Sequence, residues 1–140
     1  MKKAFLAATA AAFALAASAH AVAVRSGFDT GTLSPNDDGS TDLVNIGFTF
    51  DFFGTNYTQL YINNNGNVTF DNPLATFTPF PLLNTSTVIL APYFADVDTR
   101  GTGTVSWGQG TVDGLTAFGV NWADVGYFNS ATDLTNDFQL

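Results

Sequence analysis

Two short acidic segments contain the side chains best suited to chemistry. Residues 36–40 read Asn-Asp-Asp-Gly-Ser, and residues 96–100 read Asp-Val-Asp-Thr-Arg. Carboxylate and amide oxygens are the ligands that calcium prefers in proteins. The sequence therefore makes calcium a candidate cofactor, and the candidate ligands are Asp37, Asp38, Asp96 and Asp98.

Each segment also has another interpretation. Asn, Asp, Gly and Ser stabilise turns through local hydrogen bonds, and residues 36–40 do not follow the spacing of an EF-hand loop. Asp96 and Asp98 would point to the same side of a strand, where Arg100 could neutralise one of them. A glycosidase acid and nucleophile pair would need the same two carboxylates. These alternatives stay open at the level of the sequence.

Aromatic side chains are the second set of candidates. Exposed rings stack on sugars or anchor protein partners, whereas most rings of a small β domain fill its core. We expect Tyr127 and Phe128 to contact a partner or a glycan, because they lie in a polar stretch rich in Asn and Asp. For the other rings of this set we expect packing, and they are Tyr57, Tyr61, Tyr93, Trp107 and Trp122.

The composition excludes several classes of function. The 140 residues include twelve acidic and four basic side chains, one histidine and no cysteine. A chain without cysteine has no disulfide, no thiolate metal site and no cysteine nucleophile. Nucleic acid is not an expected partner, because binding phosphates requires clustered lysine and arginine.

The N-terminal residues have the pattern of a secretory signal peptide. Two lysines at positions 2 and 3 precede an apolar run over residues 4–17, and small residues up to Ala21 fit a cleavage site. The run is shorter than the roughly 20 residues that span a bilayer. We therefore expect residues 1–21 to be removed and the protein to be secreted, with no membrane span after cleavage.

The remaining domain, residues 22–140, is strongly acidic. Arg25 and Arg100 stand against twelve aspartates, which gives a net charge of −10. Such a surface suits divalent cations or a neutral partner such as a polysaccharide, and it repels anionic lipid and nucleic acid.

Hydrophobic residues in this domain recur every second position. Apolar side chains at 44, 46, 48, 50 and 52 alternate with polar ones, so residues 44–52 should form a strand with one face in the core. Residues 57–63 and 67–71 are β-prone and should form a hairpin. The Asn65-Gly66 pair between them favours a type I′ turn.

Further strands are predicted towards the C-terminus. Pro92 should interrupt the apolar run over residues 87–98, because proline has no amide hydrogen for a ladder. Glycines should bound two strands at residues 104–107 and 115–122, and residues 137–140 should begin another. Many short strands with frequent turns and no convincing helical face predict an all-β, antiparallel β-sandwich-like single domain.

Five blocks in this order resemble the nidogen-like (NIDO) extracellular domain family. The blocks are LSPNDDGS at 33–40, IGFTF at 46–50 with FGTNY at 53–57, YINNNGNVTF at 61–70, ILAPYFADVDTR at 89–100, and FGVNW at 118–122. The resemblance covers residues 30–140. The family's final strands are not found before Leu140, which indicates an N-terminal fragment.

The resemblance implies an adhesion module. NIDO domains occur in nidogen-like and tectorin-like extracellular proteins, where they are associated with cell–matrix adhesion. They also occur in secreted bacterial proteins, many of which carry a PEP-CTERM sorting tail, and the alanine-rich signal peptide favours a bacterial member. The family has no catalytic motif to transfer to this chain.

The sequence therefore favours a secreted, non-enzymatic module that binds an extracellular matrix protein or a polysaccharide. The alternative is a calcium-stabilised carbohydrate-binding or carbohydrate-active protein that uses Asp96 and Asp98. Self-association into a surface layer is a third possibility.

Overall fold

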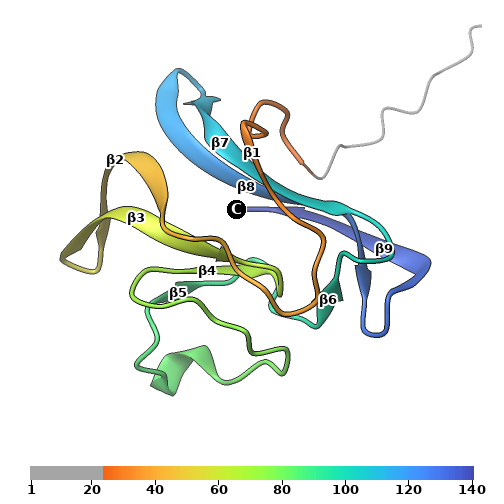
Figure 1. Cartoon of the computed structure of the whole chain (residues 1–140). Helices are drawn as coiled ribbons and strands as arrows, with labels where there is room; N and C mark the ends of the chain where they lie inside the picture. The colour runs from red at the N-terminus through yellow and green to blue at the C-terminus, as the bar shows by residue number, and fades with distance from the viewer. Residues whose placement is uncertain (1–23) are drawn as a thin grey trace, which may run out of the picture.

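The structure is a computed structural model that describes residues 24–140. The signal peptide expected over residues 1–21 lies outside the described part of the chain. Two antiparallel sheets pack against each other, and the described residues contain no α-helix (Figure 1). The predicted all-β, sandwich-like fold is therefore confirmed.

One sheet carries both ends of the described chain. Its central strand is β8 (Leu115–Tyr127), which pairs with β7 (Thr104–Val112) and β6 (Val97–Asp98) along one edge and with β9 (Ala131–Gln139) along the other. A short strand β1 (Gly31–Leu33) adds to the outer edge of β7.

The other sheet is built from the middle of the chain. Its order is β2 (Val44–Phe52), β3 (Thr55–Asn63), β4 (Asn67–Thr69) and β5 (Ile89–Leu90), and a 3₁₀ turn, η1 (Leu82–Asn84), lies in the connection before β5. The alternation predicted for β2 is confirmed, because its even-numbered residues are buried or half-buried while the odd-numbered ones are exposed. Period-two burial of this kind places one face of the strand on the core.

The core lies between the sheets and is made of aliphatic and aromatic side chains. Trp122 of β8 is fully buried and stacks on Phe138 of β9 with ring centroids 5.0 Å apart. Phe70, which follows β4, stacks on Phe50 and Phe52. The other fully buried apolar residues of the core are Ile62, Val68, Val97, Val105, Val120 and Val125.

The β3–β4 turn differs from the type I′ geometry expected for Asn65-Gly66. Asn63 pairs with Asn67, so the loop has three residues, and Gly66 has a φ of 75° while Asn65 keeps a negative φ. A three-residue loop needs one left-handed position, which glycine fills. The two-residue loops with two positive φ angles are Phe53-Gly54 and Asp113-Gly114.

The strands of the C-terminal half are longer than expected. Gly108 and Gly110 lie inside β7 rather than at its end, because the buried ring of Phe28 packs where side chains at Gly110 and Gly119 would stand. Residues 137–140 end the long strand β9 instead of beginning a new one. The break expected at Pro92 is confirmed, since it separates β5 from β6.

Within residues 24–140, no helix has the length and apolar character needed to cross a membrane.

Candidate functional site

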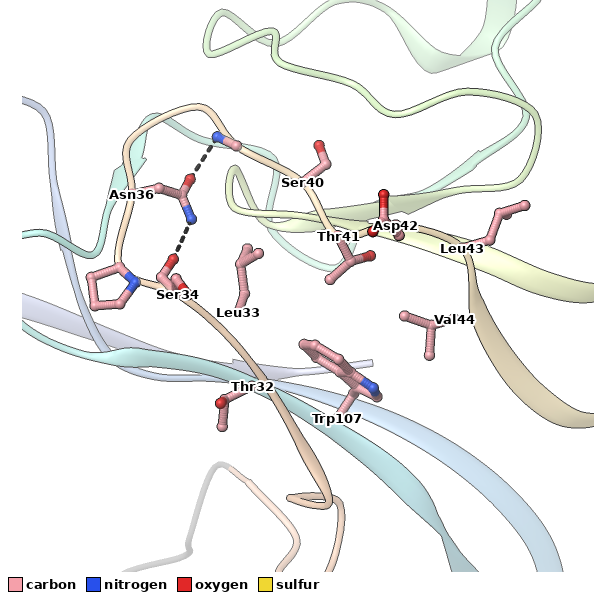
Figure 2. A pocket seen from close by; sticks show the side chains of 12 residues that line it. Thr32, Leu33, Ser34, Asn36, Ser40, Thr41, Asp42, Leu43, Val44 and Trp107 are labelled. Atoms are coloured by element: carbon pink, nitrogen blue, oxygen red, sulfur yellow. Dashed lines mark hydrogen bonds between the residues drawn. The ribbon is translucent and has the colours of Figure 1, made fainter.

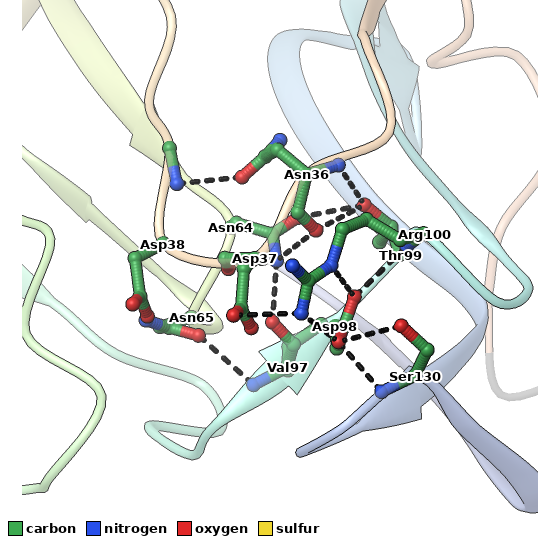
Figure 3. Close-up of polar contacts among 11 residues, drawn as sticks. Asn36, Asp37, Asp38, Asn64, Asn65, Val97, Asp98, Thr99, Arg100 and Ser130 are labelled. Atoms are coloured by element: carbon green, nitrogen blue, oxygen red, sulfur yellow. Dashed lines mark hydrogen bonds and ion pairs between the residues drawn. The ribbon is translucent and has the colours of Figure 1, made fainter.

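Three segments that are distant in sequence meet at one polar junction. They are the loop between β1 and β2, the β3–β4 turn, and the chain around β6 (Figure 3). Both acidic segments of the sequence lie here. A backbone hydrogen bond joins them, in which the amide of Thr99 donates to the carbonyl of Asn36 at 2.9 Å.

Asn64 is the centre of this junction. Its side chain is fully buried, and its Nδ2 donates to the carbonyls of Asp37 and Val97. Its Oδ1 accepts from the hydroxyl of Thr99 at 3.2 Å, and its carbonyl accepts from the indole Nε1 of Trp122 at 3.0 Å. Asn64 thus connects both acidic segments through its side chain and the core through its backbone carbonyl, since buried polar groups need such partners.

The neighbouring asparagines extend the network. Asn65 donates to Asp38 at 2.8 Å and accepts from the amide of Val97 at 2.9 Å. Asn63 donates to Asn67 and accepts from the hydroxyl of Ser40, both at 2.7 Å. Sequence reasoning missed this role, because an Asn-rich run with glycine is typical of an exposed turn. The three consecutive asparagines at 63–65 were the feature of the sequence that could have indicated this buried network.

Asp98 is engaged entirely by the protein. It is fully buried, and the Arg100 side chain donates to both of its oxygens, from Nε at 2.9 Å and Nη2 at 2.6 Å. Ser130 adds its amide at 2.7 Å and its hydroxyl at 3.1 Å. The Arg100 hydrogen bonds hold the pKa of the Asp98 carboxyl well below its usual range, although burial acts in the opposite direction. The structural ion pair considered for this residue is therefore present.

Ser130 reaches Asp98 through an unusual backbone conformation. It lies in the loop between β8 and β9, and its φ is 55°, in the left-handed region that few side chains adopt. This conformation aims the amide and the hydroxyl at the same carboxylate oxygen. The strain is thus compensated by charge-assisted hydrogen bonds.

Asp37 has a mixed environment. Arg100 donates to its Oδ2 at 2.8 Å, while its Oδ1 is buried and has no hydrogen-bond partner. Burial raises the pKa of the Asp37 carboxyl, the nearby Asp98 carboxylate raises it further, and Arg100 lowers it. The single guanidinium is shared between two carboxylates and cannot fully neutralise both.

Asp96 joins Asp37 and Asp38 rather than Asp98. One carboxylate oxygen of each of these three residues lies within 4.8 Å of the other two. Burial and the carboxylates of the two neighbours raise the pKa of Asp96. Asp96 lies just before β6, which begins at Val97, so the strand geometry assumed for the pair does not extend to it.

The positions of the four carboxylates favour cation binding over acid and nucleophile catalysis. Three clustered oxygens with uncompensated negative charge resemble the donor set that a hard cation needs. Acid and nucleophile chemistry by Asp96 and Asp98 is disfavoured, because Asp98 is buried and its oxygens already accept five hydrogen bonds. A role in calcium binding stays a prediction for Asp37, Asp38, Asp96 and Asp98.

The turn interpretation of residues 36–40 also has direct support. The amide of Gly39 donates to the side-chain oxygen of Asn36 at 2.6 Å, and the Asn36 amide group donates back to the carbonyl of Ser34 (Figure 2). The asparagine thus fixes the loop that presents Asp37 and Asp38.

A pocket of about 550 Å³ lies beside this loop, between β1 and the start of β2 (Figure 2). Trp107 of β7 and Val44 of β2 supply apolar surface, and Ser34, Ser40 and Thr41 of the loop also line the pocket. Asp42 is the single titratable side chain among its described lining residues. One carboxylate does not form the pair that glycoside hydrolysis uses.

The two aromatic contact candidates are exposed, as expected. Tyr127 is 37% exposed at the end of β8, where its hydroxyl donates to Asp133 at 2.7 Å, and the adjacent Phe128 is 67% exposed. Sequence reasoning missed Phe53, which is 95% exposed at the β2–β3 turn with a φ of 51°. The contact role of Tyr127 and Phe128 stays a prediction.

Comparison with protein families identifies the class of protein. A family model described as NIDO related matches residues 6–140, so the chain belongs to the NIDO-related family. The resemblance inferred from the five sequence blocks is thus confirmed at the level of the family. No solved structure is significantly similar to this chain.

Similarity to individual proteins supports this family assignment. The chain is similar to nidogen of Drosophila melanogaster, with 29% identity over 134 residues that cover 77% of this chain. It is also similar to alpha-tectorin of Mus musculus and of Homo sapiens, with 41% identity over 63 residues, or 44% of this chain, in each case. The match spans 10% of the fly nidogen and 3% of each tectorin.

Proposed function

We propose that this protein is a secreted, non-enzymatic module that binds an extracellular matrix protein. The observation that carries the proposal is the NIDO-related family match over residues 6–140, together with the adhesion role that this resemblance implies. The similarity to nidogen and alpha-tectorin supports the same setting. A polysaccharide is the alternative partner, because neutral sugars also tolerate an acidic surface.

The exposed aromatic pair is the proposed contact surface. Tyr127 and Phe128 adjoin Ser130, whose amide and hydroxyl are fixed on Asp98. A ring on an anchored loop loses little entropy on binding, which is why aromatic residues often dominate interfaces. The proposed contact surface would then lie at the end of β8 and on the loop that follows it, next to the polar junction.

Binding to a panel of purified matrix proteins and polysaccharides tests the proposal. We expect at least one matrix protein to bind, and Phe128→Ala to weaken that binding by roughly tenfold or more, as for a central aromatic contact. Leu83→Ala is the matched control, because Leu83 is 97% exposed on a different loop and should have no effect. No binding above background across the panel, with calcium present, would contradict the proposal.

We further propose that calcium stabilises the module at the Asp37, Asp38 and Asp96 cluster. The three carboxylate oxygens within 4.8 Å of one another and the unpartnered, buried Oδ1 of Asp37 support this role. We do not propose Asp98 as a ligand of this cluster, because its oxygens already accept hydrogen bonds from Arg100 and Ser130.

Thermal unfolding in EDTA and then in calcium tests this part. Free calcium at one hundred times its dissociation constant should add about 2.7 kcal/mol to the free energy of unfolding. For a domain of this size that is a rise in Tm of roughly ten degrees. Asp96→Asn should abolish the rise, whereas Asp71→Asn, an exposed carboxylate outside the cluster, should preserve it. An equal Tm in EDTA and calcium would show that calcium does not stabilise the fold.

A further inference from the structure

The turn between β2 and β3 contains a residue that its backbone geometry disfavours. Phe53 and Gly54 form a two-residue loop in which both φ angles are positive, 51° and 89°. Glycine adopts such angles freely, and asparagine or aspartate tolerates them, whereas a bulky side chain in the left-handed region strains the backbone. Phe53 therefore lowers the stability of this turn.

The same geometry occurs with a preferred residue at a second hairpin. Asp113 and Gly114 join β7 to β8 with φ angles of 52° and 81°. Both turns need a residue before the glycine that tolerates a positive φ. Because the β7–β8 turn has aspartate at this position, the turn geometry alone does not explain the phenylalanine of the β2–β3 turn.

The core gains little from Phe53, which is 95% exposed. Its ring meets the ring of Phe52 edge-on, with centroids 4.8 Å apart and planes at 84°. Phe52 in turn stacks on the buried ring of Phe70. The ring of Phe53 is thus supported from one side while nearly all of its surface stays in solvent. A strained, exposed and supported ring is typical of an anchor for a partner.

A carboxylate lies against the same turn. Oδ1 of Asp51, an exposed residue, accepts a hydrogen bond from the amide of Gly54 at 3.0 Å. Among residues 24–140 the ion pairs all involve Arg100, so the charge of Asp51 has no counter-ion there. An accessible ring next to an unpaired carboxylate favours a cation, through cation–π attraction and charge-assisted hydrogen bonds. A lipid surface fits less well, because the carboxylate would have to be buried with the ring.

We propose that Phe53 and Asp51 bind an arginine side chain of the partner protein, with the guanidinium stacked on the ring and its N–H groups donating to the carboxylate. Arginine fits better than lysine, because its planar guanidinium stacks on rings and pairs with carboxylates through two hydrogen bonds. The twelve aspartates of the domain, against two arginines, also attract a basic partner and repel a second copy. This inference rests on the proposed function and names the chemistry of its partner.

An NMR titration of the 140-residue chain with Nα-acetyl-arginine methylamide tests the site. We expect amide shifts centred on Phe53 and Gly54 that saturate at roughly millimolar probe, as for a single exposed side chain. The control probe is the corresponding citrulline compound, which has the same shape without the positive charge. It should cause no saturable shift at this turn.

Two substitutions separate the ring from the carboxylate. Phe53→Asn removes the ring and supplies a residue suited to the turn, whereas Asp51→Asn removes the charge and keeps an oxygen for the Gly54 amide. Each should weaken probe binding by roughly threefold or more. Asp113→Asn makes the same change of charge at the other turn and should leave probe binding unchanged. Phe53→Asn should also raise the Tm by roughly three degrees, because it relieves backbone strain.

The proposal is overturned by shifts that are absent, equal with the citrulline compound, or equally large at Asp113 and Gly114. Unchanged probe binding by Phe53→Asn would also overturn it, as would a lower Tm of this variant, because the ring would then serve the fold. Matrix binding is measured separately. If a matrix protein binds wild type and Phe53→Asn equally, the proposed function stands and this inference fails. If no matrix protein binds, the proposed function fails, whereas saturable probe shifts at Phe53 would still support the arginine site.

Discussion

Asp96 and Asp98 lie two residues apart but have opposite surroundings. Asp98 is fully buried, paired with Arg100 and bonded to Ser130, and its pKa is lowered. Asp96 is partly exposed beside two further carboxylates, and its pKa is raised. The first carboxylate is a structural part of the fold, whereas the second carries charge that the protein leaves uncompensated.

The difference shows how one short segment can serve both stability and binding. Hydrogen bonds to a charged carboxylate favour its ionised form, while burial and like charges disfavour it. The buried side of the junction satisfies its polar groups internally through Asn64 and Asp98. The outer side, at Asp37, Asp38 and Asp96, is where a cation or a basic group would be favourable.

The largest loss of stability is expected when Asn64, the centre of the polar junction, is replaced. Asn64→Ala would leave buried carbonyls of the two acidic segments without a donor, so we expect the free energy of unfolding to fall by about 4 kcal/mol. Asn56→Ala, at an exposed position of β3, should change it by less than about 0.5 kcal/mol. Urea unfolding of both variants measures the difference, and similar small losses would show that the junction is not structural.

Asp98→Asn should have the next largest effect. The substitution leaves Arg100 and the donors of Ser130 without a charged acceptor, and we expect a loss of about 3 kcal/mol. Asp71→Asn is the matched control at an exposed site. A loss below about 1 kcal/mol for Asp98→Asn would contradict the structural role assigned to its ion pair.

The pH dependence of stability should reflect the two opposite pKa shifts. Because the folded pKa values of Asp37 and Asp96 are raised, the fold gains stability as the pH falls through those values towards the usual value of 3.8. Because the folded pKa of Asp98 is lowered, its contribution is complete above the usual value of 3.8 and is lost as the pH falls below it. Urea unfolding between about pH 2 and 7 should therefore show a maximum in mild acid. A steady fall in stability from neutral pH downward would contradict this.

The smallest change in stability is expected in the cluster of Asp37, Asp38 and Asp96. Asp96→Asn removes a like charge from the cluster, and we expect it to stabilise the calcium-free protein by less than about 1 kcal/mol. The gain should disappear in calcium, because the variant lacks one of the proposed ligands. Destabilisation of the calcium-free protein, measured by urea unfolding against wild type, would show that Asp96 is structural like Asp98.

The sheet framework could be predicted from the sequence because it depends on local patterns. The alternation over residues 44–52 identifies β2, since burying one face of a strand requires period two. The lengths of β7 and β9 could not be predicted. The glycines of β7 looked like turn residues, and only the position of Phe28, about 80 residues earlier in the chain, explains why the strand continues through them.

The candidate site was predicted in part. The acidic residues were identified by type, but Asp37 and Asp96 lie 59 positions apart, and only the folded topology brings them together. The buried role of Asn64 was missed because local propensity favours an exposed turn. Ser130 was missed because its loop conformation depends on the pairing of β8 with β9.

The most direct test of the account is an NMR titration of the side-chain carboxyl carbons of Asp96 and Asp98, without and with calcium. We expect Asp98 to titrate below the usual value of 3.8 and Asp96 to titrate above it. Calcium should then lower the apparent pKa of Asp96 and leave that of Asp98 unchanged. Shifts of both residues in the same direction, with or without calcium, would contradict the division between a structural and an uncompensated carboxylate.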